Sequence, residues 1–341
     1  MTFYTVTKPG GVKNEDFDLA LDTLADMLVN SLFAESQIDK ERQVVLEELI
    51  RGKNDPRRYA VELFFKNVWD DHPARNLPIG SRETLANSDR RVLVAFRDAN
   101  FLASNMYTAV VGDQSHDVIL EKVAAAFERM PNGAKPAYER APLPSAKAQR
   151  IEDTVAGTQA QIALGLPAPG ADHPDTYALD IMSVVLGEVG RRLVGEIRDK
   201  RGLASGVGSA YSTLSDVGCW YSIVGTSPGN VDQVLDLIVE QMRRIRSEPI
   251  TGEILADAKS YIEGRAVLGL QTSIAFAQYL ADREAIGVEP PLEEYLRRVS
   301  GVSVEDVQRV AQAYLDPDHA TLVIMRPGET NGNGTALPAD E

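Results

Sequence analysis

An internal repeat is the feature of this sequence that most restricts its fold. A pattern of aspartates and aliphatic residues occurs at residues 18–24 and again at 232–238. A second pair of similar segments, 39–52 and 251–264, is separated by nearly the same number of residues. Further matches keep the same order, and their offset stays between 212 and 219 residues. Because a constant offset marks a duplicated unit, we predict two related halves.

The two copies differ in length at their start. The second copy begins near Arg150, so about seventy residues precede the strand-like run that starts at Trp220. Two residues precede the equivalent run at Phe3, which leads into a turn at Pro9–Gly10. The first half is therefore expected to lack its opening strands and one helix.

Hydrophobic periodicity and capping residues predict an α+β fold. Phe17, Leu21, Leu24 and Leu28 form the stripe of an amphipathic helix, and Asp55-Pro56 starts a helix that reaches Trp69. Further helices are predicted at 39–52, 175–186, 191–200, 231–246, 252–267 and 273–285, with a last one after the capping box at Ser303. Strands are predicted at 107–111, 158–166, 207–224 and 320–325.

These elements divide the chain into four segments. Residues 1–130 form an incomplete N-terminal half, and the proline-rich residues 131–149 form a linker. Residues 150–327 form the C-terminal half, and residues 328–341 form a disordered tail.

Charge and cysteine content restrict the partners and the location. The net charge of −15 disfavours nucleic acid, and the arginine pairs at 90–91, 191–192 and 243–244 are expected on solvated helix faces. No apolar run approaches the ~18 residues of a membrane span, so no membrane partner is expected either. The single cysteine, Cys219, excludes an internal disulfide and favours a cytoplasmic location.

Glutamates on the predicted helix 39–52 are candidates for chemistry. Glu41 and Glu48 share a face within about 20° and border Val44 and Val45, whereas Glu47 points elsewhere. A solvated helix surface would explain them. A metal site would explain them too, because a buried carboxylate needs a partner.

The segment from Glu41 to Leu49, ERQVVLEEL, resembles the signature of the pitrilysin/insulinase family of zinc metallopeptidases. The resemblance extends through residues 78–80, 105–106, 111–113 and 196–204. It implies two duplicated halves of the metalloprotease type, each an antiparallel sheet with helices packed on one face, which enclose a chamber for unfolded peptides.

The resemblance also assigns site residues. In that family a His-x-x-Glu-His helix supplies two zinc ligands and a general base, and a glutamate on a second helix completes the site. Glu48 matches this metal ligand, and Glu41 matches a further catalytic glutamate. Arg198 matches an arginine that helps to bind the substrate backbone together with a tyrosine, but Ser205 stands at the tyrosine position. Ser260 takes the place of Glu48 in the second copy, as expected for a degenerate half.

The histidine ligands of that family are missing. His72, His116, His173 and His319 are too far apart for His-x-x-Glu-His or its reverse, and we expect each to be structural. Since catalytic zinc takes three protein ligands and a water, the chain alone is expected to bind no zinc and to cleave no peptide.

Two functions remain open. The chain is either a truncated zinc endopeptidase that acts on peptide substrates, or a non-catalytic subunit or scaffold that pairs with a catalytic homologous chain in a homo- or hetero-oligomer. Retention of Glu41 and Glu48 favours the first, and Ser205 favours the second. In either case an incomplete first half is expected to expose apolar surface at or near the Phe17 stripe.

Overall fold

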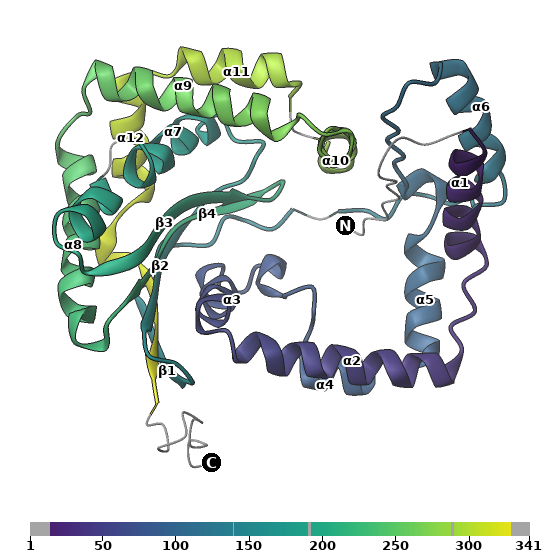
Figure 1. The fold of residues 1–341 in the computed structure, drawn as a ribbon, viewed down its shortest axis with the longest axis horizontal. Coiled ribbons are helices and arrows are strands. Elements are labelled where there is room, and N and C mark those ends of the chain that lie inside the picture. The colour runs from purple at the N-terminus through teal and green to yellow at the C-terminus, as the bar shows by residue number, and fades with distance from the viewer. Residues whose placement is uncertain (1–13, 139, 190–191, 288–289, 329–341) are drawn as a thin grey trace. The chain divides into compact units, whose positions relative to one another are not determined.

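The structure, a computed structural model, describes residues 14–138, 140–189, 192–287 and 290–328 (Figure 1). The predicted run at Phe3, the turn at Pro9–Gly10 and the tail from residue 329 lie outside these ranges. Contacts divide the chain into a first unit, residues 1–46, 81–139 and 267–287, and a second unit, residues 47–80, 140–266 and 288–341. The division into four segments stays a prediction.

The helices are α1 (Asn14–Val29), α2 (Glu35–Lys53), α3 (Pro56–Val68), α4 (Arg82–Asn87), α5 (Arg90–Asn100), α6 (His116–Ala126), α7 (Thr176–Gly187), α8 (Val231–Ser247), α9 (Gly252–Gly269), α10 (Ser273–Ile286), α11 (Leu292–Gly301) and α12 (Val304–Tyr314). Shorter helical turns are η1 (Pro73–Arg75), η2 (Ala103–Asn105), the π-helical η3 (Val194–Asp199), η4 (Pro228–Asn230) and η5 (Pro317–His319). The strands are β1 (Gln149–Val155), β2 (Ala160–Pro169), β3 (Ala204–Thr213), β4 (Val217–Thr226) and β5 (Thr321–Pro327).

The helix positions support the predicted repeat. Helices α1, α2 and α3 each begin 217 residues before α8, α9 and α10, respectively. Capping explains one of these starts, because Asp55 accepts hydrogen bonds from the backbone N–H groups of Arg57 and Arg58 at the first turn of α3. The capping box at Ser303 is also confirmed, with Asp306 as its partner.

The second unit contains a five-stranded sheet in the order β1-β5-β2-β4-β3. The expected antiparallel pairing is found for β2–β4, β2–β5 and β3–β4, whereas β1 pairs with β5 in parallel. The short connection between β1 and β2 explains this exception: the two strands run in opposite directions on either side of β5, so one of them must lie parallel to it. The sheet and its helices make the fold α+β, as predicted.

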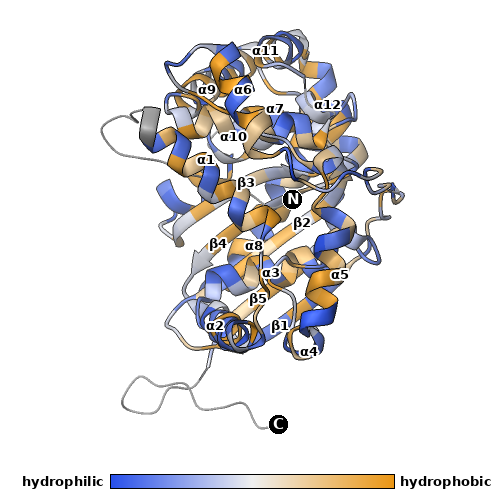
Figure 2. Ribbon diagram, turned by 90° about the vertical axis from the view of Figure 1, so that its right-hand side faces the viewer, coloured by the Kyte–Doolittle hydropathy of each residue, from blue (hydrophilic) through white to orange (hydrophobic). Residues whose placement is uncertain are grey.

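Both faces of this sheet are covered. On one face Ile162, Leu164 and Leu166 of β2 belong to a core with α7, α8 and α12, the arrangement that the family resemblance implies. On the opposite face Phe64 of α3 packs with Ala163 and neighbouring apolar side chains. All of β2 is buried as a result, and Figure 2 shows β2 and β5 largely in the hydrophobic colour. The covering of the second face by α3 was not predicted.

Gly165 of β2 is required where α3 approaches the sheet. A Cβ added there would lie 2.2 Å from the carbonyl oxygen of Trp220 and 2.8 Å from Cζ of Phe64. Any larger residue would therefore displace the neighbouring strand or the helix.

In the first unit, α1 packs against α6. The predicted stripe is confirmed: Leu21 is buried, and Phe17 is partly buried beneath the ammonium group of Lys122. The expected apolar exposure lies beside the stripe instead, since Leu19 is 67% and Leu32 is 80% exposed.

The predicted strand at residues 107–111 is wrong, because these residues are neither helix nor strand. A strand forms only where a neighbour completes its hydrogen-bond ladder, and none of the strands in the described ranges pairs with this segment. Residues 131–138 and 140–148 also carry no helix or strand, in line with the predicted linker.

Candidate functional site

Helix α2 carries both of the glutamates that the sequence singles out. Its acidic first turn at Glu35 and basic last turn at Arg51 and Lys53 match the helix dipole. Glu41 and Glu48 are exposed, and Val44 beside them is 44% exposed. The helix face that carries Glu41, Val44 and Glu48 is therefore exposed to solvent, which agrees with the first of the two explanations from the sequence. Solvation alone can stabilise both carboxylates, so burial no longer supports a metal at Glu48.

Glu48 lies within electrostatic range of the start of α3. The Arg58 guanidinium donates to Glu62 at 2.7 Å, and this hydrogen bond and charge raise the pKa of Arg58 above its usual value, with a smaller contribution from Glu48. The weak attraction to Arg58 does not occupy the carboxylate, which remains accessible to a ligand.

A zinc centre does not form from these residues alone. No group of three or more His, Cys, Asp or Glu side chains that could bind a metal ion occurs in the described part of the chain. Catalytic zinc takes three protein ligands, so Glu48 by itself does not fit one. The role of Glu48 as a ligand stays a prediction from the family resemblance.

Two of the four histidines cap turns in the second unit. His72 is buried, and its Nδ1 accepts a hydrogen bond from the N–H of Ala74 at 3.1 Å. Its Nε2 lies 3.6 Å from Oδ2 of Asp216. His173 accepts through Nδ1 from the N–H of Asp175 at 3.1 Å. These contacts agree with the structural interpretation, although no sequence pattern indicated the pairing of His72 with the distant Asp216.

The other two histidines lie at the ends of helical segments. His116 is the first residue of α6 and is exposed. His319 ends η5 just before β5, with its Nδ1 2.9 Å from Oδ2 of Asp316.

Arg198 lies at the end of η3, and its side chain is 51% exposed. Its Nε donates to Asp199 at 2.9 Å. Ser205, at the position of the expected tyrosine, lies at an irregularity near the start of β3, where its Oγ accepts from Gln159 at 3.4 Å. Neither contact tests the predicted substrate role of Arg198.

Within the described ranges, no helix combines the length and the apolar character needed to cross a bilayer.

Comparison with known proteins identifies the family. Residues 1–79 match the model of insulinase, peptidase family M16, and residues 88–262 match that of the peptidase M16 inactive domain. An uncharacterized zinc protease of Mycobacterium leprae is 29% identical over 92% of this chain and 72% of its own length.

Solved structures agree with this result. A protease from Helicobacter pylori aligns with a TM-score of 0.80 and 25% identity over 93% of this chain and 78% of that one. The peptidase M16 inactive domain from Pseudomonas fluorescens aligns with a TM-score of 0.79 and 23% identity over 93% and 76%, respectively. Since the inactive-domain model alone matches more than half of the residues, this chain belongs to peptidase family M16, the insulinase family.

Proposed function

We propose that this chain is a zinc-endopeptidase-like protein that is inactive alone, and that Glu48 ligates zinc only when two histidines and a general base come from outside these 341 residues. The observation that carries the proposal is the combination of family membership with the absence of His-x-x-Glu-His from the sequence. The four histidines do not replace the motif, because they lie far apart in sequence and at turns or helix ends.

The remaining roles follow from the same resemblance. Glu41 is assigned to the catalytic site beside Glu48, and Arg198 is assigned to binding of the peptide backbone. The hydrogen bond from Arg198 to Asp199 uses Nε, so the Nη groups can reach a peptide carbonyl. Cleavage inside a chamber and a cytoplasmic location belong to this proposal and rest on the family and on the single cysteine.

Metal analysis tests the first part. The purified chain, dialysed against trace zinc, is expected to retain far less than one zinc per chain by mass spectrometry and to leave a quenched peptide library intact. One tightly bound zinc per chain that a chelator removes would contradict the proposal.

Complementation tests the assignment of Glu48. Co-expression with a family segment that carries His-x-x-Glu-His is expected to give zinc binding and peptidase activity. Glu48→Gln should abolish both, because an amide is a poor replacement for a carboxylate ligand. Glu47→Gln is the matched control, since it removes the same charge from the neighbouring exposed position of α2. Equal activity of the two variants would refute the assignment.

A second candidate function is that of a non-catalytic subunit paired with a catalytic homologous chain. The match of residues 88–262 to the inactive domain favours it, as do Ser205 in place of the tyrosine and the exposed Leu19 and Leu32. Sedimentation of the chain with and without a co-expressed catalytic homologue tests this function. A chain that stays monomeric in both cases would exclude it.

A further inference from the structure

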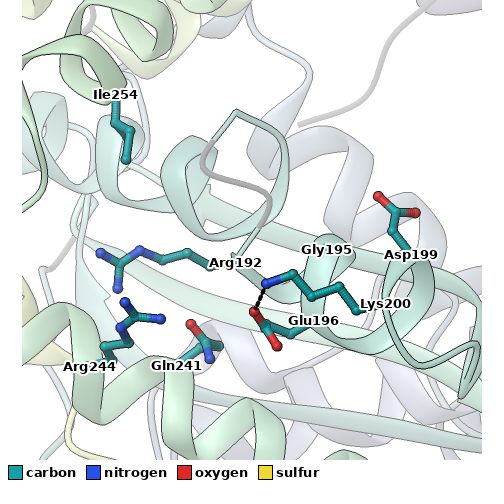
Figure 3. A pocket seen from close by; sticks show the side chains of 8 residues that line it. All are labelled: Arg192, Gly195, Glu196, Asp199, Lys200, Gln241, Arg244 and Ile254. Carbon is teal, nitrogen blue, oxygen red and sulfur yellow. Dashed lines mark hydrogen bonds and ion pairs between the residues drawn. The ribbon is translucent and has the colours of Figure 1, made fainter.

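A cavity of about 450 Å³ opens in the second unit beside η3 and α8 (Figure 3). Arg192, Glu196 and Lys200 line it from one segment, and Gln241 and Arg244 line it from α8. The roles that the resemblance assigns belong to Glu41, Glu48 and Arg198 and do not include these residues.

Arg192 points its guanidinium group toward that of Arg244 (Figure 3). Its Nη1 is buried and has no hydrogen-bond partner. The expectation that Arg192 lies on a solvated helix face is therefore wrong, because the side chain turns toward α8 instead. Burial, and next the charge of Arg244, lower the pKa of Arg192 below its usual value, and the smaller attraction of the Glu248 carboxylate opposes them only in part. Two facing guanidinium groups repel each other unless an anion lies between them.

Gln241 supplies a second buried polar group without a partner. The residue is 1% exposed, and its Oε1 accepts no hydrogen bond. The oxygen and nitrogen of a glutamine amide have nearly the same shape, and their assignment follows from the partners present. With the amide turned over, its N–H groups can donate to a ligand in the cavity.

The carboxylates around the cavity already have cationic partners. Glu196 pairs with Lys200 and Arg201, and Glu248 accepts from Nε of Arg244 at 2.8 Å. This bond leaves the Nη groups of Arg244 available. Asp199, the other carboxylate in the lining, pairs with Arg198 at 2.9 Å. Among the described residues that line the cavity, the cations Arg192, Lys200 and Arg244 outnumber the carboxylates Glu196 and Asp199, so the positive charge there exceeds the negative charge.

We propose that Arg192, Arg244 and Gln241 bind a small oxyanion, either a phosphate or a carboxylate, in this cavity. A planar guanidinium group donates two parallel hydrogen bonds to such an anion. Two of these groups with a neutral amide donor suit one compact anion, and the volume lies within the range of small-molecule sites. The proposal does not depend on zinc or peptidase activity, so the two can fail separately.

Calorimetric titration at constant ionic strength tests this site, with inorganic phosphate as one probe and an acetylated dipeptide with a free C-terminal carboxylate as the other. The same dipeptide as its C-terminal amide is the ligand control. We expect one anion per chain, bound about tenfold or more weakly by Arg192→Gln and by Arg244→Gln, since hydrogen bonds to charged groups are worth about 1.5–3 kcal/mol.

Arg243→Gln is the matched protein control. It removes the same charge one residue away on α8, but Arg243 pairs with Asp318 at 3.0 Å and does not line the cavity. Arg192→Lys keeps the positive charge but loses the pair of parallel N–H donors, so it separates the contribution of geometry from that of charge. Circular dichroism checks that each variant folds.

The outcomes are distinct. The site is supported if phosphate or the dipeptide with a free carboxylate binds to the unchanged chain and to Arg243→Gln but not to either cavity variant. The probe that binds more tightly then identifies the source of the anion. Equal weakening in all variants, or no binding of either probe, overturns the proposal.

Discussion

Replacing Phe64 by alanine is expected to loosen α3 from the sheet. Phe64 is fully buried, and its ring lies 5.5 Å from that of Tyr221, centroid to centroid. Truncation of a buried phenylalanine costs about 3–5 kcal/mol. Because the facing residue, Gly165, has no side chain that could fill the hole, we expect about 4 kcal/mol, a large part of the ~5–15 kcal/mol that stabilises a typical domain.

Native-state hydrogen exchange measures this loss helix by helix, which matters because the chain has two compact units and a single unfolding free energy is not defined for it. The amides of α3 should lose about a thousandfold of protection, since 1.4 kcal/mol is tenfold. Lys66→Ala is the control: Lys66 is exposed on the same helix and its loss should change stability by less than about 0.5 kcal/mol. A change below about 1 kcal/mol for Phe64→Ala would refute the packing argument.

Three further predictions concern the second unit. Although burial alone would raise the pKa of Asp175, hydrogen bonds from Arg309 and Tyr314 lower it overall. Asp175→Asn should therefore cost about 2 kcal/mol at neutral pH, and native-state hydrogen exchange should show the difference shrinking as the pH falls from the usual carboxyl value of 3.8 toward the lowered pKa of Asp175. Burial raises the pKa of the Cys219 thiol, so a thiol reagent should react with it only after unfolding; fast labelling of the native protein at about pH 8 would contradict this. Gly165→Ala should cost about 1–3 kcal/mol in the same exchange measurement, because its Cβ would lie 2.2 Å from a carbonyl oxygen of β4, and a neutral result would show that the strands can separate there.

Local signals in the sequence predicted most elements of the fold. The Asp55 cap and the Ser303 capping box depend on residues a few positions apart, and the repeat depends on a fixed offset; the helices that begin at Pro56 and Val304 form where the caps place them. The predicted strand at 107–111 is wrong because a strand depends on a neighbouring strand, and local sequence does not show where in the chain that neighbour lies. Strand β1 and helices α4 and α11 were not predicted at all.

For the candidate site, too, the sequence predicted the local features but not the contacts between distant residues. The sequence alone identified Glu48 as a match to a family ligand and established that no paired histidines accompany it. The sequence could not decide whether Glu48 is buried. Apolar residues on α2 show which face of the helix could be covered, but not whether another element covers it. The structure shows that side chain exposed.

The sequence by itself determined the duplication, the position of most helices and the missing His-x-x-Glu-His motif, since each can be read from residues close together or from a fixed offset. Only the tertiary structure decided that α3 covers the second face of the sheet and that Arg192 meets Arg244 across a cavity. Whether a side chain is buried or paired with an opposite charge depends on which residues lie near it in the folded chain. Residues 192 and 244 become neighbours only when the chain between them folds.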